Sequence, residues 1–139
     1  MYYLGVDSGG TKTAFTVIDN KGNIVFELVK GTGHYLQIGF DGVKALHKDG
    51  LKKIYETLKI SKELLSYAFI GIPGYGEVKD DKLKLEKIIG EVYKGINYTI
   101  GNDVESGWAG SLACQPGVNI VCGTGSIAIG VNEKNEIAR

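Results

Sequence analysis

The stretch "LGVDSGGTKTAFTVID", residues 4–19, decides the fold of this chain. An apolar run ends at Asp7, a loop of small residues follows, and apolar and polar residues alternate again from Ala14. Alternation of this kind is typical of half-buried strands, so the pattern predicts two strands joined by a glycine-rich hairpin loop. Dinucleotide-binding folds and P-loops place their glycines between a strand and a helix, so this loop belongs to neither motif.

A hairpin loop of this composition can still bind phosphate. Gly9 and Gly10 allow backbone N–H groups to approach a ligand closely. Hydroxyl groups and a positive charge come from the three residues that follow, Thr11, Lys12 and Thr13. Asp7 ends the first strand and is a candidate to hold Mg²⁺ through water, because Mg²⁺ keeps several waters and takes few carboxylates. Taken alone, a tight hairpin without any ligand explains the stretch equally well.

The rest of the chain alternates between strand and helix patterns. The full expectation is strands at 2–6, 14–18, 24–29, 67–72, 96–100, 118–122 and 127–131, helices at 41–59, 80–94 and 103–113, and a loop at 31–39. Gly95 is the expected C-terminal cap of the second helix. The order βββαβαβα predicts an α/β domain with a mixed sheet and helices on both of its faces.

The opening pattern returns after Pro116 as a strand, a small-residue loop, a second strand and a polar turn. This repetition predicts that residues 1–116 form one domain and that residues 117–139 begin a second, similar domain. On this interpretation the chain is the N-terminal part of a longer protein. Alternatively, the last strands pack back on the first domain.

The repeated loop, "CGTGSIAIG" at residues 122–130, again lies between two apolar strands with no helix after it. Its candidate phosphate-binding residues are Gly123, Thr124, Gly125 and Ser126. Two such loops can hold a polyphosphate from both sides. The pair therefore predicts a nucleotide as the ligand.

Asp103, in "IGNDVESGW" at residues 100–108, is the candidate catalytic residue. It follows a strand and opens a helix, so its carboxylate belongs in the crevice at the carboxyl ends of the strands, where α/β sheets bind ligands. A helix cap would explain the residue without any chemistry. The other interpretation is a base toward a hydroxyl that attacks phosphorus, since phosphoryl transfer depends mostly on positioning and charge stabilisation.

Composition limits the classes of partner. Lys plus Arg number 16, as do Asp plus Glu, so charge gives no reason to expect nucleic acid or an anionic membrane as partner. The chain starts without a basic segment and apolar leader, and no apolar run approaches the ~18 residues of a membrane span. We therefore expect a cytoplasmic protein. Cys114 and Cys122 lack the spacing of a metal knuckle, and we expect both thiols to be buried.

Four stretches, taken in order, resemble the N-terminal half of the BadF/BadG/BcrA/BcrD-type ATPase family: "DSGGTKT", "GIPGYGE", "NDVESGWAGS" and "CGTGSIAIG". The best known sugar-active members of that family are the N-acetylglucosamine kinases. The resemblance implies a ribonuclease H-like, actin-like ATPase fold. It also implies ATP and Mg²⁺ as cofactors and a small sugar, most naturally an amino sugar, as substrate. The resemblance is also compatible with a homodimer.

The resemblance also implies roles for single residues. Asp7 corresponds to the metal-associated aspartate, the two glycine loops to the phosphate loops, and Asp103 to the base of the sugar kinases. The residues that would face the sugar are Gly33, His34, Gly74, Asn102, Asp103 and Thr124. For His34 a plain surface position, and for Gly74 a plain turn, are the alternatives. Trp108 is a candidate platform for a sugar ring or, alternatively, a core residue, and His47 is expected to be a packing residue.

Two further functions stay open from the sequence. One is an ATPase that activates a CoA-ester dehydratase or reductase through an iron–sulfur cluster, which would need cysteine ligands. Neither Cys114 nor Cys122 lies in a suitable cluster motif. The other is a non-catalytic sensor of nucleotide or sugar.

Overall fold

The computed structural model describes residues 1–122 and 126–138. Its main sheet has five strands in the order β3-β2-β1-β4-β5. Antiparallel hairpins join β1 to β2 and β2 to β3, whereas β1, β4 and β5 run parallel to one another. The sheet is therefore mixed, as the sequence predicts. The strands are β1 Tyr2–Ser8, β2 Lys12–Asp19, β3 Ile24–Gly31, β4 Leu65–Ile72 and β5 Tyr98–Asn102.

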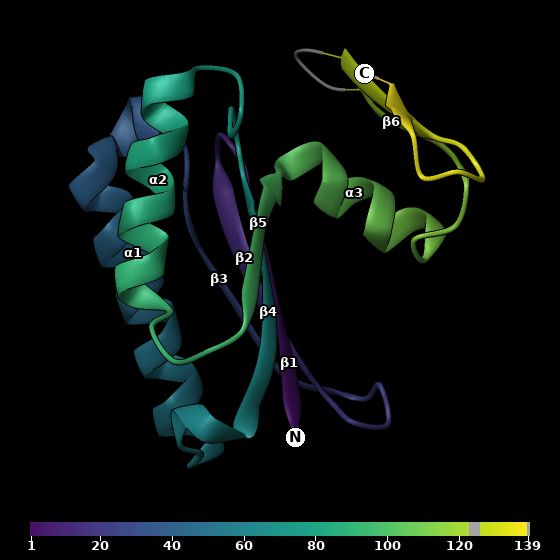
Figure 1. Ribbon diagram of the computed structural model, residues 1–139. Coiled ribbons are helices and arrows are strands. Elements are labelled where there is room, and N and C mark those ends of the chain that lie inside the picture. The colour runs from purple at the N-terminus through teal and green to yellow at the C-terminus, as the bar shows by residue number, and fades with distance from the viewer. Residues whose placement is uncertain (123–125, 139) are drawn as a thin grey trace.

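Helices cover both faces of this sheet, which confirms the prediction. α1 (Tyr35–Leu58) and α2 (Lys79–Val92) lie side by side on one face, while α3 (Asp103–Leu112) lies on the other (Figure 1). A short 3₁₀ helix, η1 (Lys62–Leu64), precedes β4. Alternate residues of β1 and β2 face α1 and α2 and are buried: Leu4, Val6, Phe15 and Val17. These side chains build the core because every second residue of a strand points to the same face of the sheet.

α1 begins earlier than the sequence pattern suggested. The expectation of a loop at 31–39 is wrong for residues 35–38, because α1 starts at Tyr35 rather than at Asp41. The His34 side chain caps the first turn by accepting a hydrogen bond from the Leu36 N–H. Gly39, with φ 70° and ψ 169°, then interrupts the helix with a kink. The expected start at Asp41 therefore corresponds to the straight part of α1 after this kink.

The end of α2 also differs from the expectation. Its C-terminal cap is Tyr93, not Gly95. Gly95 has a φ of +89° and lies in the turn that leads to β5. β5 accordingly starts at Tyr98 and extends to Asn102, two residues later at each end than expected. The sequence pattern thus predicts the end of α2 close to its observed position but names the wrong capping residue.

His47 is a packing residue, as predicted. Its side chain is fully buried on α1, its Nδ1 lies 3.0 Å from the Tyr93 hydroxyl, and its ring meets the Phe15 ring edge-on at 5.8 Å. Burial lowers the pKa of His47 to about 4, because desolvation disfavours the charged imidazolium. The imidazole is therefore neutral around pH 7.

A second, three-stranded sheet lies beyond α3 (Figure 1). It consists of β6 (Gly117–Cys122), β7 (Ser126–Val131) and β8 (Ile137–Ala138), and it packs on α3 through Val104, Trp108, Ile127, Ile129 and Val131. Trp108 thus takes part in core packing. The prediction of buried thiols is wrong, since Cys114 and Cys122 are both exposed. Cys114 lies in the turn after α3, and Cys122 ends an edge strand with little cover.

The turns that follow β2 and β7 share one hydrogen-bond pattern. Asp19 Oδ1 accepts from the backbone N–H groups two and four residues later, at 2.8 and 2.9 Å. Asn132 Oδ1 accepts from the corresponding N–H groups at 2.9 Å each. In both turns the residue three positions later has a positive φ, Gly22 at 83° and Asn135 at 60°. The two polar turns of the sequence repeat therefore share their hydrogen bonds and a positive φ at the same position.

Candidate active site

Four loops meet at one edge of the main sheet. β1, β3, β4 and β5 all point the same way, because β1, β4 and β5 are parallel and β3 is separated from β1 by two antiparallel pairings. The chain leaves these strands at Ser8, Gly31, Ile72 and Asn102. The predicted site residues that follow these strand ends are therefore gathered along this edge, where open α/β sheets bind ligands.

The first glycine loop, residues 9–11, is a tight hairpin with free donors. The Gly9 N–H donates to the Lys12 carbonyl at 2.8 Å, which closes the turn. Within the described parts of the chain, the N–H groups of Gly10 and Thr11 have no protein acceptor. Thr11 and Lys12 are exposed. Two backbone donors and one positive side chain are thus available to an anionic ligand at this point.

Residues 32–34 lie directly against the first glycine loop. The Gly33 N–H donates to the Gly9 carbonyl at 3.2 Å. A Cβ at Gly33 would lie 2.6 Å from Ser8 Cβ and 2.7 Å from Thr13 Oγ1, so a larger residue has no room there. The hydroxyls of Ser8 and Thr13 are buried and have no hydrogen-bond partner among the described residues. The two predicted loops are therefore in close contact.

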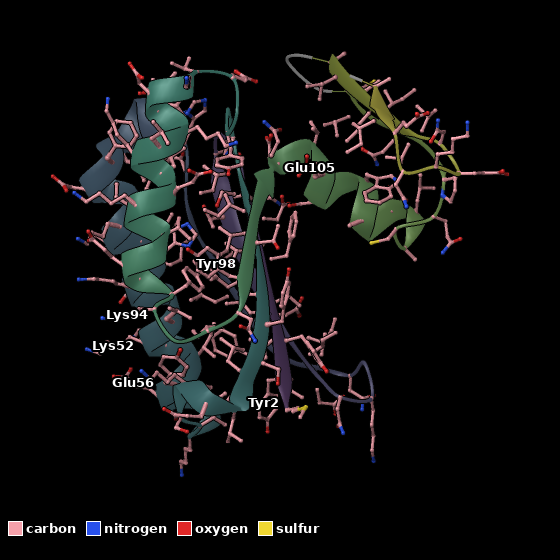
Figure 2. The ribbon with its side chains drawn as sticks, in the orientation of Figure 1. Tyr2, Lys52, Glu56, Lys94, Tyr98 and Glu105 are labelled. Carbon is pink, nitrogen blue, oxygen red and sulfur yellow. The ribbon has the colours of Figure 1, made fainter. Side chains whose placement is uncertain are left out.

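Asn102 connects the loop after β4 to the start of α3. Its Oδ1 caps the helix by accepting from the Val104 N–H at 3.2 Å, and its Nδ2 donates to the Tyr75 carbonyl at 3.2 Å. Glu105, labelled in Figure 2 at the beginning of α3, completes a capping box by accepting from the Asn102 N–H. Asn102 is thus a structural tie between two loops of the site, in addition to its predicted place on the substrate side.

Gly74 lies in the same loop and packs against α1. Its φ of +73° is in the left-handed region that favours glycine, and a Cβ there would lie 3.3 Å from the Tyr35 ring. Tyr35 is buried and stacks on Phe40, with ring centroids 5.3 Å apart. Sequence reasoning missed Tyr35, because the residue falls in a stretch that was interpreted as a loop. The only available signal was its position directly after His34.

Asp7 and Asp103 act on each other electrostatically. Partial desolvation raises the pKa of Asp7, the Asp103 carboxylate raises it further, and Lys12 lowers it. The two residues belong to β1 and to the first turn of α3. Mg²⁺ typically takes one or two carboxylates together with waters and substrate phosphates, so this pair and the adjacent glycine loop fit the donor set of a magnesium–polyphosphate site.

Two glycines allow α3 to come close to the sheet. A Cβ at Gly71 on β4 would collide with the Ser106 hydroxyl, and a Cβ at Gly101 on β5 would collide with the Glu105 carboxylate. A cavity of about 550 Å³ lies between α3 and this sheet face, with Asp7, Phe69 and Trp108 among its lining residues. Asp103 directly follows β5 and therefore lies at the same edge of the sheet as Asp7, near the end of β1.

The second glycine loop falls largely outside the described residues. This applies to Gly123, Thr124 and Gly125, whereas Ser126 starts β7 opposite Cys122 and is exposed. The predicted residues that the structure brings to the sheet edge are Asp7, Gly9, Gly10, Thr11, Lys12, Thr13, Gly33, His34, Gly74, Asn102 and Asp103. In the described part of the chain, no helix has the length and apolar character to span a membrane.

The residues of this candidate site lie within a match to a known family. The model of the BadF/BadG/BcrA/BcrD ATPase family matches residues 4–139. The chain belongs to this family. The resemblance noted from the sequence is therefore confirmed, and so is the actin-like ATPase fold.

Two curated relatives match over 99% of the chain. An N-acetyl-D-glucosamine kinase of Dictyostelium discoideum is 32% identical over 148 residues, covering 99% of this chain and 46% of the relative. An N-acetylmuramic acid/N-acetylglucosamine kinase of Clostridium acetobutylicum is 28% identical over 138 residues, covering 99% of this chain and 45% of the relative. The chain thus spans about half the length of these curated relatives.

A solved structure shows the same fold. The inorganic polyphosphate/ATP-glucomannokinase of an Arthrobacter species superimposes with a TM-score of 0.68 at 18% identity, covering 94% of this chain and 58% of the other. At this identity the likeness concerns the fold of the backbone.

Proposed function

We propose that this chain forms one lobe of an ATP-dependent sugar kinase that transfers a phosphoryl group to a hydroxyl of an amino sugar. The observation that carries the proposal is the placement of Asp7 and Asp103 at one edge of the sheet, next to a glycine hairpin with free N–H donors. The names of the two curated relatives support a sugar as the acceptor. N-acetylglucosamine is the first candidate because both relatives' names include it.

In this proposal Asp103 is the general base. Its carboxylate accepts the proton of the sugar hydroxyl while that oxygen attacks the γ-phosphorus of ATP, and the bond from the γ-phosphorus to the bridging oxygen of ADP breaks. Asn102 holds the first turn of α3 in place through its cap and its bond to the Tyr75 carbonyl. Gly33, His34 and Gly74 belong to the two neighbouring loops and would line the sugar side.

The phosphates would lie on the first glycine hairpin. The N–H groups of Gly10 and Thr11 and the Lys12 ammonium would compensate the negative charge that spreads over the phosphoryl oxygens. Asp7 would hold Mg²⁺ through water, and bound Mg²⁺ would neutralise charge on the phosphates. Gly123, Thr124, Gly125 and Ser126 would bind the phosphates from the opposite side.

Residues 117–139 would begin a second lobe in this proposal. The shared geometry of the turns after β2 and β7 supports a repeat of the β1–β3 unit by β6–β8. Two lobes that close around the substrates would exclude water from the transferred group. The names of the two kinase relatives favour this function over an iron–sulfur activator or a sensor.

The decisive experiment measures ADP release by the intact gene product with Mg·ATP. The acceptors are N-acetylglucosamine, N-acetylmuramic acid, glucosamine, glucose and no sugar. Stimulation by one amino sugar is the expected result, and Asp103→Asn should lower kcat by a factor of about 10²–10⁴. The matched control Asp49→Asn, on α1, should keep wild-type turnover. Equal slow release in every well, or full activity of Asp103→Asn, would refute the proposal.

A further inference from the structure

We propose that Thr32 and Gln37 are positioning residues that orient the backbone N–H groups of the first glycine loop toward the phosphates. Neither residue stood out in the sequence. The inference rests on the proposed function, because it assigns to these N–H groups a polyphosphate ligand. It adds a mechanism by which the segment at the start of α1 controls the shape of the phosphate loop.

Thr32 is bonded to the glycine loop through its side chain. Its Oγ1 donates to the Gly9 carbonyl at 3.2 Å and accepts from the His34 N–H at 3.1 Å. The Gly33 N–H donates to the same Gly9 carbonyl at 3.2 Å. The Gly9 carbonyl thus receives two hydrogen bonds from one short segment, and both of its acceptor positions are used.

Gln37 holds the next carbonyl of the loop. Its Nε2 donates to the Gly10 carbonyl at 3.0 Å, across the gap between the first turn of α1 and the hairpin. The Gln37 side chain is exposed on that turn. The hydrogen bond to the Gly10 carbonyl, rather than burial, therefore holds this side chain against the loop. The two successive carbonyls of the loop are therefore both bonded to side chains of residues 32–37.

The geometry of the peptide unit determines how these hydrogen bonds orient the N–H groups. The carbonyl of Gly9 and the N–H of Gly10 belong to one planar peptide unit, as do the carbonyl of Gly10 and the N–H of Thr11. In a trans peptide the two groups point in opposite directions, and none of the described peptide bonds is cis. Bonding each carbonyl to the α1 segment therefore directs the Gly10 and Thr11 N–H groups away from that segment.

Such anchoring matters because glycine has few conformational preferences of its own. The Gly9–Gly10 pair could rotate its peptide units at low cost, and a loop that samples several orientations binds phosphate less tightly. The anchors lie on the segment that also carries Gly33 and His34. The loop for the phosphates and the loop assigned to the sugar are thereby held as one unit.

The test uses side-chain changes that remove one donor each. Thr32→Val and Gln37→Met keep the approximate shape but lose the hydrogen bond, whereas Thr32→Ser keeps the hydroxyl. The matched controls are Thr57→Val and Gln115→Met, which alter exposed side chains far along the chain from the loop. The measurements, on the intact gene product, are the Kd for Mg·ATP by calorimetry and kcat and KM for both substrates.

We expect Thr32→Val and Gln37→Met each to raise the Kd and KM for Mg·ATP by roughly 2- to 10-fold, the effect of one lost hydrogen bond. The KM for the sugar and the melting temperature should change little, and Thr32→Ser and both controls should resemble the wild type. Equal ATP affinity in the wild type and both variants would overturn the inference. A rise that Thr32→Ser shares would also overturn it for Thr32.

The outcome separates this inference from the proposed function. If the wild type phosphorylates an amino sugar and the variants bind ATP normally, the function stands and the positioning role is wrong. If the variants lose ATP affinity while no sugar stimulates turnover, the positioning role stands and the kinase proposal is wrong. A wild-type protein that does not bind Mg·ATP would overturn both.

Discussion

The Asp103 carboxylate, in the first turn of α3, raises the pKa of Asp7 at the end of β1. Residues so far apart in the chain interact because β1 and β5 end at the same edge of the sheet, with β4 between them. Asp7 is also partly desolvated, which raises its pKa in the same direction. The pKa of Asp7 therefore depends on how close the first turn of α3 lies to the end of β1.

Asp103→Asn should lower the pKa of Asp7. The substitution removes the like charge that disfavours the ionised form of Asp7, while the amide keeps the size of the side chain. The measurement is an NMR titration of the Asp7 carboxyl carbon. Asp49→Asn is the control and should leave the titration unchanged. An unchanged Asp7 titration in Asp103→Asn would mean that the carboxylates do not interact in solution.

Gly33→Ala should destabilise the protein by about 1–3 kcal/mol, the usual cost of overpacking. The new Cβ would lie 2.6 Å from Ser8 Cβ and 2.7 Å from Thr13 Oγ1, two side chains that are fully buried. Urea denaturation measures the change. Gly31→Ala is the matched control, because nothing lies within 4 Å of its Cβ position.

A second substitution tests the cause of this effect. Ser8→Gly removes one of the two obstructing side chains, so the double variant Ser8→Gly/Gly33→Ala should lose less stability than the sum of the single changes. Additive losses would show that Gly33 is required for a reason other than this contact.

The stability of the protein should fall as the pH drops from about 6.5 to about 4. The pKa of His47 is near the ordinary histidine value of 6.5 in the unfolded chain and about 4 in the folded one, so the unfolded state binds the proton first as the pH falls. Above this window the imidazole is neutral in both states and its contribution is constant. Below it, about 3 kcal/mol of stability has been lost.

Urea denaturation between pH 7 and pH 4 measures this dependence. His47→Phe removes the titrating group and should flatten the pH dependence, although the Tyr93 hydroxyl then loses its partner. His34→Gln, which changes the only other histidine, should keep the wild-type slope. A slope that His47→Phe leaves intact would assign the acid sensitivity to carboxyl groups instead.

Asn102→Ala should lower stability by about 1–2 kcal/mol, the usual cost of losing a helix N-cap. Asn102→Asp keeps an oxygen for the Val104 N–H but loses the donor to the Tyr75 carbonyl, so its loss should be smaller. Thermal denaturation ranks the variants. Asn20→Ala, in the exposed turn after β2, is the control. Equal stability of Asn102→Ala and wild type would contradict a capping role.

Most of the secondary structure could be predicted because it depends on local patterns. The glycine-rich loop and the alternation that follows it from Ala14 identified the first hairpin, and Asp103 after an apolar strand identified the start of α3. The start of α1 could not be predicted in this way. A histidine cap is an unusual signal, and the kink at Gly39 separates the first turn of the helix from its apolar stripe.

The exposure of the cysteines shows a second limit. Cysteine is usually buried, yet Cys114 and Cys122 are exposed because the turn after α3 and the edge strand β6 have little packed against them. Composition predicts the average behaviour of a residue type. The neighbours that a given residue meets depend on the tertiary arrangement.

By itself, the sequence determined the order of strands and helices, the two glycine hairpins, and the residues that end each strand at one edge of a sheet. These features follow from periodicity, turn chemistry and capping, which act over a few residues. Tertiary structure decided which of these residues meet. The coupling of Asp7 to Asp103 requires β1, β4 and β5 to lie parallel and side by side, and the Thr32 and Gln37 bonds require the start of α1 to lie against the hairpin. Contacts of this kind depend on the packing of whole elements, for which a local pattern carries no signal.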